Sequence, residues 1–515
     1  MVQVQEQHQA VEGRLRSNKF SRMKKIALII FLCVGTTYSF AQNEEDVLRY
    51  TMTNFGGSAR NISLAGAMTA LGGDFSVATS NPAGIGKMTK DNFSATLNVE
   101  LLNAESTFYG AVKNESGSTA NLSNLSYVKA YNLDPKKFNN WYGVQLGMGL
   151  NRINSFQERI NYGGVADSSI LHSFIAEANG TPDSLLLDAY PFSSGLAYYA
   201  YGIDTPPGGD EYTTSFNSGQ SVHDRQITRT GGMTEYNFTL SGNYGNKLLI
   251  GGGLTFIKSN FSERFQHVET FTDDSIFLNS INYTGELDIE GWGYSARLGV
   301  IYMPFDYLRV GLGAQLPTVF NLNDRWTNNM TADTKDGPKT VDPSYVYVGR
   351  YDYRVRTPFR ANGSIGLILK KFGSIGLEVE MVDYSNSILK TNKKSQDRYS
   401  FTAENFQIEN LYRSVFNVKL GMEIRLNPQA YLRGGAAYYP SPYQSNKVAN
   451  AAPTYFYTLG LGYNWGNVFI DMAYALKLHK MDYYAYDPTL NGSYANIDLS
   501  NSQVLFTLGF RFDSE

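Results

Sequence analysis

One short stretch decides the fold of this protein, and it reads Tyr142-Gly143-Val144-Gln145-Leu146-Gly147-Met148-Gly149-Leu150. Its even-numbered positions are apolar, whereas its odd-numbered positions hold glycine or glutamine. Successive side chains of a β-strand point to opposite faces of the sheet. The stretch therefore predicts a strand with one apolar face and one face that is polar or bare.

The same alternation recurs along the chain. Apolar side chains occupy every second position in residues 236–240, 308–316, 468–478 and 504–512. Repeated alternation over about ten residues is the pattern of a barrel wall with lipid on one side and water or a plug on the other. Strands of soluble β-sandwiches are shorter, with about 5–6 residues. The segments of this kind predict fourteen strands, near residues 92–103, 121–131, 140–153, 233–246, 248–260, 285–303, 306–317, 353–370, 373–384, 412–426, 429–439, 453–464, 467–479 and 501–512.

The connections between these strands sort by length. Those after even-numbered strands are short, such as Gly245-Asn246-Lys247. Those after odd-numbered strands are mostly long and polar, and cover about 154–232, 261–284, 318–352 and 385–411. Short turns at one end and long loops at the other characterise bacterial outer-membrane barrels, with the long loops outside the cell. We therefore expect an all-β transmembrane barrel of 14 antiparallel strands in the outer membrane of a Gram-negative bacterium.

The N-terminus has the layout of an export signal. Met23-Lys24-Lys25 precedes the apolar run 26–35, and Ser39-Phe40-Ala41 offers a cleavage site before Gln42. This predicts a signal peptide over residues 23–41, which follows an N-terminal extension. Residues 1–41 are therefore expected to be absent from the mature protein. The only cysteine, Cys33, lies in this leader, so the mature chain is predicted to have no disulfide, thiol nucleophile or cysteine metal site.

Composition and charge exclude further classes of protein. The 515 residues include 49 glycines and 37 tyrosines, and the formal net charge is −3. After the leader no apolar run is long enough for a spanning helix, so a membrane-embedded chain must close as a barrel to satisfy its backbone. Balanced charges give no reason to expect binding to nucleic acid.

The segment 42–91, which precedes the barrel region 92–515, differs in kind. It is dominated by small residues, including the glycines Gly56, Gly57, Gly72 and Gly73, and Asn81-Pro82-Ala83 begins a tight turn. It has too few large side chains to form a core of its own. We expect it to occupy the lumen of the barrel as a plug, or hatch.

These residues resemble a known family, the FadL-type outer-membrane transporters of long-chain fatty acids and aromatic hydrocarbons, especially members from Bacteroidetes-like bacteria. The resemblance rests on the segment 57–60, on the stretch 70–74, on Asn81, Pro82 and Ala83, and on the C-terminal strand 455–463. It implies fourteen strands, a lumenal hatch, and passive movement of a hydrophobic ligand past the hatch or sideways into the membrane. Of the family's functional residues only the hatch motif Asn81, Pro82 and Ala83 carries over.

The partners expected on this basis are a hydrophobic small molecule, outer-membrane lipid and the barrel assembly machinery, and we expect a monomer. The last strand ends on the aromatic Phe512 and resembles the C-terminal assembly signal of such barrels, although the tail 513–515 follows it.

Alternation also predicts which charged side chains point into the lumen. A charge on the lipid face near the midplane would cost about 2–4 kcal/mol for Arg or Lys. We interpret the predicted lumen charges as a salt-bridged network that holds the hatch. The alternative is that they line a channel or bind the carboxylate of a ligand. The predicted lumen charges are Arg297, Arg309, Glu378, Glu380, Lys419, Glu423, Arg425, Asp471, Lys477 and Arg511.

Catalysis finds little support in the sequence. The histidines of the mature chain, His172, His223, His267 and His479, are scattered through expected loops and strand ends. No Ser-His spacing suggests a hydrolase, and Gly251-Gly252-Gly253 lies inside a strand pattern, where it more simply makes room for the hatch. We expect no enzyme activity, no cofactor and no metal site.

Two other functions remain open. A secretion-associated or surface-attachment barrel would act as a docking platform with ordered, aromatic outer loops, as Tyr198, Tyr199 and Tyr201 suggest. A general porin would need an open lumen, which the segment 42–91 argues against.

Overall fold

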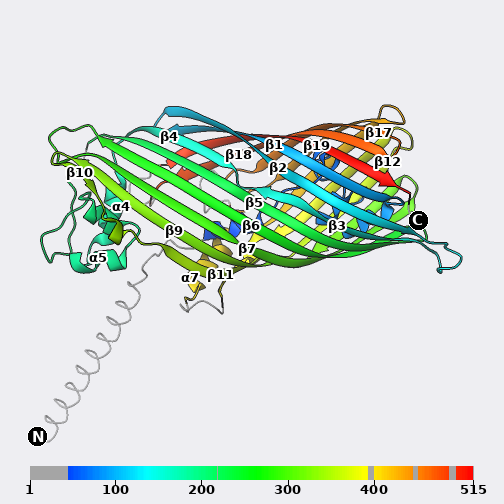
Figure 1. Ribbon diagram of the computed structural model, residues 1–515, viewed down its shortest axis with the longest axis horizontal. Helices are drawn as coiled ribbons and strands as arrows, with labels where there is room; N and C mark the ends of the chain where they lie inside the picture. Colours follow the sequence, from blue (N-terminus) through cyan, green and yellow to red (C-terminus); the bar gives the residue numbers. More distant parts are fainter. Residues whose placement is uncertain (1–43, 217–218, 393–398, 445–450, 487–493, 514–515) are drawn as a thin grey trace, which may run out of the picture. The chain divides into compact units, whose positions relative to one another are not determined.

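The computed structural model describes residues 44–216, 219–392, 399–444, 451–486 and 494–513, so the expected leader lies outside the described residues. The strands form one antiparallel sheet of 19 strands. The sheet closes on itself because β1 (Asp91–Phe108) pairs with both β2 (Ala111–Asn132) and β19 (Tyr494–Phe512). The expected barrel is therefore confirmed, and Figure 1 shows its tilted strands.

Fourteen of the strands form the wall, as expected. Besides β1, β2 and β19 they are β3 (Trp141–Ser155), β5 (Ser221–Tyr244), β6 (Leu248–Phe271), β7 (Leu278–Phe305), β8 (Leu308–Gln315), β12 (Arg360–Ile368), β13 (Gly373–Asp383), β15 (Ser414–Arg425), β16 (Ala430–Tyr439), β17 (Thr454–Trp465) and β18 (Val468–Tyr484). Five further strands extend the wall at one end, and they are β4 (Glu158–Ala166), β9 (Val319–Thr334), β10 (Gly337–Thr340), β11 (Gly349–Arg356) and β14 (Ile388–Thr391).

The apolar face of the wall points outward. On β7 the side chain of Leu298 is 64% exposed, whereas that of its neighbour Arg297 is 4% exposed. On β3 Met148 is likewise exposed and Gln145 is buried. In water such an arrangement would be unfavourable, because apolar surface is left hydrated while polar groups are buried. In a bilayer it is the stable one, since lipid covers the apolar belt.

The connections after the even-numbered wall strands are short, as expected, but two of the expected long loops are wrong. Most of 261–284 belongs to β6 and β7, and most of 318–352 to β9, β10 and β11. Likewise β1 and β2 continue until a two-residue turn at Tyr109-Gly110 joins them. Beyond the lipid both faces of a strand carry polar residues, so the alternation fades although backbone pairing continues.

The expected loop 154–232 also shortens, because β4 and β5 take up both of its ends. The remaining connection, about 167–220, contains the helices α4 (Ile170–Ala178), α5 (Asp183–Ala189) and α6 (Ser194–Tyr199). Their buried side chains share an apolar cluster with strand residues such as Ile281 and Met330. We call this connection the helical cap. The other connections contain η3 (Pro343–Tyr345), η4 (Tyr384–Asn386) and α7 (Thr402–Leu411).

The segment before β1 packs against the inner face of the wall. It contains α2 (Glu44–Thr51), α3 (Ala59–Ser63), η1 (Phe75–Thr79) and η2 (Pro82–Lys87). Figure 1 shows this dark blue segment among the strands. Among the described residues, no helix is long and apolar enough to cross a membrane. We call residues 44–90 the lumenal segment.

Candidate functional site

The lumenal segment is anchored to the wall by Asn81, the first residue of the predicted hatch motif. Its amide Nδ2 donates to the backbone oxygens of Val300 on β7 and Leu312 on β8, both at 3.2 Å. Its Oδ1 accepts from the backbone N–H of Ala83 at 3.0 Å, which caps η2 with Pro82 at its first position. Asn81 is fully buried, so each of these bonds replaces a lost bond to water.

Glycines on both surfaces let the two backbones meet. A Cβ at Gly56 would lie 1.8 Å from the carbonyl oxygen of Arg152 on β3, so only glycine fits there. On the wall, a Cβ at Gly251 would lie 2.5 Å from the backbone nitrogen of Ala83. The other predicted hatch glycines, Gly57, Gly72 and Gly73, all have positive φ angles.

The first group of predicted lumen charges forms ion pairs between the wall and the lumenal segment. Glu423 on β15 accepts from Arg60 of α3 at 3.2 Å and from Arg433 of β16 at 2.7 Å. Arg433 also contacts Asp471 on β18. Arg309 on β8 donates to the carbonyl oxygen of Leu71. These contacts fasten the segment to strands β8 and β15 of the wall.

A second group pairs mainly within the wall. Lys419 and Glu378 lie 3.0 Å apart, and Glu378 also accepts from Thr69 of the lumenal segment. Glu380 pairs with Arg360 at 3.2 Å. The guanidinium of Arg297 binds both carboxylate oxygens of Glu235 on β5.

The remaining three predicted charges take other positions. Lys477 is half-buried beside the cavity described below. Arg511 lies over the ring of Phe469, with the guanidinium carbon 4.6 Å from the ring centre. Arg425 is exposed where β15 ends.

The residues that complete this network, Arg60, Glu235, Arg360 and Arg433, were missed from the sequence. Strand parity could have found three of them, since Arg433, for example, neighbours the exposed Leu432. Arg60 carries no such signal, because it belongs to a helix of the lumenal segment.

The wall is interrupted on one side. β2 pairs with β3 only between Asn124 and Asn132, although β2 starts at Ala111. The ladder between β3 and β5 has a register shift between Arg152 and Asn154, where β3 bends, and its continuation β4 still pairs with β5 but not with β2. Within the described residues no backbone ladder joins residues 111–123 to β3 or β4. Side-chain contacts cross the interruption, such as Ser155 to Glu100 at 2.6 Å.

A cavity lies beside this interruption. Its lining combines Asn54, Phe55 and Gly56 of the lumenal segment with the bend of β3 and with Lys477 of β18. Its volume is about 60 Å³. Ligand pockets for drug-sized molecules measure about 300–1,000 Å³, so this cavity holds only a few waters unless its lining moves.

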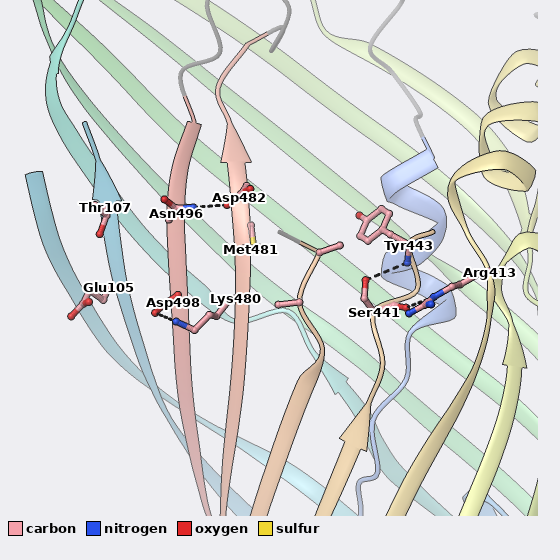
Figure 2. Close-up of a pocket in the computed structure, with 12 residues that line it drawn as sticks. Glu105, Thr107, Arg413, Ser441, Tyr443, Lys480, Met481, Asp482, Asn496 and Asp498 are labelled. Atoms are coloured by element: carbon pink, nitrogen blue, oxygen red, sulfur yellow. Dashed lines mark hydrogen bonds and ion pairs between the residues drawn. The ribbon is translucent and has the colours of Figure 1, made fainter. Parts of the chain in front are cut away.

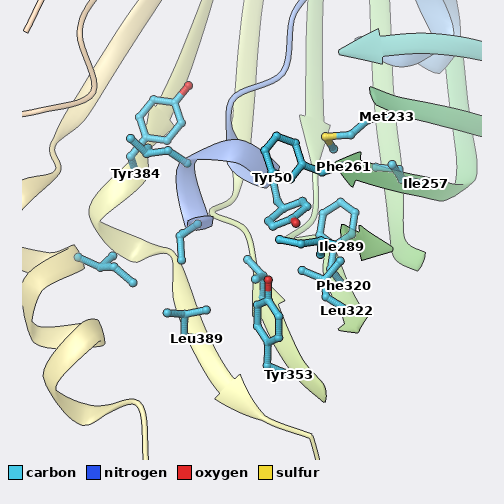
Figure 3. Packing of buried hydrophobic residues seen from close by; sticks show 14 of the residues in the cluster. Tyr50, Met233, Ile257, Phe261, Ile289, Phe320, Leu322, Tyr353, Tyr384 and Leu389 are labelled. Atoms are coloured by element: carbon cyan, nitrogen blue, oxygen red, sulfur yellow. The ribbon is translucent and has the colours of Figure 1, made fainter. Parts of the chain in front are cut away.

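Around α2 the lumen is filled by an apolar cluster, unlike the polar interior of a water-filled porin. Val47, Leu48 and Tyr50 of α2 belong to one buried cluster with inward-facing wall residues such as Phe320 and Tyr353. Figure 3 shows Tyr50 against Phe320, and their ring centres are 5.6 Å apart. Burial raises the pKa of the Tyr50 phenol, so it stays neutral at physiological pH.

A larger hollow of about 730 Å³ lies at the rim. Figure 2 shows Glu105 of β1, Lys480 and Asp482 of β18, and Asp498 of β19 around it. Lys480 pairs with Asp498, and Asn496 donates to Asp482 at 2.6 Å. The charged lining is unsuited to an apolar ligand.

Comparisons with known proteins identify the family. The sequence model of the family described as outer membrane protein transport protein (OMPP1/FadL/TodX) matches residues 193–513. The chain belongs to the FadL/TodX family. This confirms the predicted family, although the matched region starts after the hatch motif. The chain is thus an outer-membrane barrel of a family of channels for hydrophobic compounds, and the family consists of transport proteins, not enzymes.

Solved structures show the same fold. A Pseudomonas aeruginosa FadL homologue superposes with a TM-score of 0.52 at 13% identity, covering 89% of this chain and 99% of that one. A TodX monoaromatic hydrocarbon channel carrying the deltaS2 mutation gives 0.51, also at 13% identity and the same coverages. The Pseudomonas putida toluene transporter TodX gives 0.48 at 13% identity, covering 90% and 99%. No curated protein sequence matches the chain.

Proposed function

We propose that this FadL/TodX-family barrel takes up hydrophobic compounds passively, with long-chain fatty acids as the leading substrate class, and that the lumenal segment is its hatch. The observation that carries the proposal is the interruption between β2 and β3 beside a lumen cavity that the hatch itself lines. A ligand that leaves through this interruption reaches the membrane without crossing water.

The apolar cluster around α2 supports this substrate class. Inward-facing Phe261, Phe320 and Met233 offer an apolar surface, which a hydrophilic solute would gain nothing from contacting. A general porin is disfavoured, because the lumen is filled by α2 and its apolar neighbours.

The size of the cavity implies movement of the hatch. At about 60 Å³ the cavity cannot admit a fatty acid or an aromatic hydrocarbon as it stands. We infer that the body of the hatch, from Asn54 to Met88, shifts away from the wall when substrate enters, and that the long connections face the outside of the cell.

Lys477 offers a way to separate the two substrate classes. Lys477 is part of the cavity lining and can pair with the carboxylate of a fatty acid, whereas an aromatic hydrocarbon has no charge to pair with it. The K477M variant should therefore lower oleate uptake and leave toluene uptake unchanged.

The test measures uptake of radiolabelled oleate and toluene by host cells that lack their own transporter for these compounds. Cells with the protein should exceed cells with the empty vector at least several-fold, and mass spectrometry of the detergent-purified protein should find bound fatty acid. Uptake equal to that of the empty vector for both compounds would overturn the proposal.

The ordered helical cap favours one alternative, a docking platform for secretion or surface attachment. The rings of Tyr199 and Tyr345 pack with centres 4.4 Å apart, and Tyr201 lies exposed beside them. Burial raises the pKa of Tyr212 in the cap to about 12. Recovery of a partner protein without any small molecule would favour this function.

A further inference from the structure

Two histidines and a glutamate meet on the inner face of β5 and β6. His223 lies opposite Glu269 in the ladder, and His267 is two residues before Glu269 on the same strand. Their exposed fractions are 2%, 0% and 0%. From the sequence, we expected His267 in a loop and no metal site. The strands continue further than the alternation indicates, and so bring the three side chains together.

The distances among their donor atoms suit a shared cation. Nε2 of His267 lies 2.9 Å from Oε1 of Glu269, and Nε2 of His223 lies 3.7 Å from the same oxygen. The three ligand atoms all fall within 4.8 Å of one another. Tetrahedral ligands bound to Zn²⁺ at about 2.0–2.2 Å are separated from each other by about 3.3–3.6 Å. Shifts of about 1 Å or less would therefore place all three around one ion.

Two more oxygens lie at the same point, one from Ser168 of the helical cap and one from Ser221 at the start of β5. Nε2 of His223 lies 2.9 Å from the carbonyl oxygen of Ser168 and 2.8 Å from Oγ of Ser221. This nitrogen carries at most one proton, yet it faces a carbonyl, a hydroxyl and a carboxylate. Converging lone pairs of this kind are expected around a cation.

The site is buried, so polar atoms that lack a partner would destabilise the folded protein. The ring of Phe108 stacks on His223 with centres 5.7 Å apart. Nδ1 of His267 is buried without a hydrogen-bond partner among the described residues. Glu269 accepts from the backbone N–H of Ile170 at 2.8 Å and from Ser169, so its carboxylate has the hydrogen bonds that an ionised metal ligand needs.

We propose that His223, His267 and Glu269 bind a divalent transition metal, and that Zn²⁺ is the ion their His₂Glu set fits. The ion connects strands β5 and β6 to the start of α4, because Ser168, Ser169 and Ile170 contact the same groups. Its role is structural, since the site is closed to solvent: it holds the helical cap to the barrel. This inference is independent of the substrate.

The experiment uses the full chain, purified without a tag in detergent and stripped with a chelator. Zn²⁺ content is measured by plasma mass spectrometry, and Co²⁺ serves as a spectroscopic probe. The expected result is one equivalent of metal, visible Co²⁺ absorption of a low-coordinate N/O site, and slower proteolysis of the cap when Zn²⁺ is present.

Two variants locate the site. H267Q should bind at least about 100-fold more weakly, because even loss of an outer partner costs about 10–100-fold. H172Q is the matched control: it removes a histidine of the neighbouring helix α4 and should bind as the parent does. Strand content by circular dichroism shows that each variant is folded.

Three results would overturn the proposal. They are failure of the stripped parent protein to take up Zn²⁺ or Co²⁺, unchanged metal binding in H267Q, and equal loss in H172Q. The first applies to the unmodified chain, so the proposal stays testable even if H267Q fails to fold.

Discussion

A disulfide between the hatch and the wall would test whether the hatch moves. A Cβ at Gly366 on β12 would lie 3.4 Å from Cβ of Ala70 in the lumenal segment. Disulfides have Cβ–Cβ distances of about 3.5–4.5 Å, so the pair A70C/G366C needs an adjustment of a few tenths of an ångström. The only native cysteine, Cys33, lies in the expected leader, so no other thiol should compete.

The expected magnitudes follow from the geometry. An intact bond keeps Ala70 and β12 within about 6 Å, so this part of the hatch cannot leave the wall. It also closes a loop of about 300 residues, which stabilises the folded state by at most about 5–6 kcal/mol in the chain-entropy model. Oxidised protein should therefore be harder to unfold, yet its uptake should fall at least tenfold.

The assay compares oleate uptake before and after reduction. Reduction should restore uptake, while A70C and G366C alone should respond to neither oxidant nor reductant. Electrophoresis without reductant measures the fraction that is cross-linked. Full uptake by protein that is completely cross-linked would refute the inference that the hatch body shifts.

Three further predictions concern the cavity, the hatch and the ion pairs. Q157W should fill the cavity at the bend of β3 and lower oleate uptake several-fold in the cell assay, because Gln157 is part of the lining. N81D removes the amide that donates to two wall carbonyls and buries a charge in its place. Each buried group left without a hydrogen bond costs about 1–3 kcal/mol, so the hatch should be held less firmly. The expected result is faster proteolysis of the hatch. R297M leaves Glu235 as an unpaired buried carboxylate and should cost about 3–5 kcal/mol in urea unfolding.

Each of these has a matched control. Q157N keeps the amide at smaller size and should transport normally; equal loss in Q157N and Q157W would argue against a passage there. Proteolysis of N81D no faster than that of the parent would mean that Asn81 is not an anchor. For the ion pair, the double variant R297M/E235L should recover most of the lost stability, since it removes both charges. A double variant as unstable as R297M would contradict this explanation.

Much of the wall was predictable from local patterns. A strand that separates lipid from the lumen must alternate, so Met148 and Gln145 reveal their faces without any knowledge of their neighbours. Strand number and the short turns follow from the same rule. The rule ends where the lipid ends, and for that reason the end of β6, the start of β7 and the whole of β9 were mistaken for loops.

The candidate site was predictable only in part. Asn81 and the hatch glycines stand out by residue type, because tight turns and close backbones need them. The partners of Asn81 could not be inferred, since the carbonyls of Val300 and Leu312 lie more than 200 residues away and every residue offers such a group. The same holds for Arg60, whose partner Glu423 is on β15.

By itself the sequence determined the barrel, its fourteen strands and the lipid-facing side of each, because burial in a bilayer constrains every second residue of a strand. Only the tertiary structure decided where the wall is interrupted, what fills the lumen and which histidines meet. Those features depend on backbone pairing and on contacts between distant segments. Neither backbone pairing nor such contacts produce a periodic pattern in the sequence. The roles of Arg152 at the bend of β3 and of His267 on β6 therefore could not be predicted from the sequence.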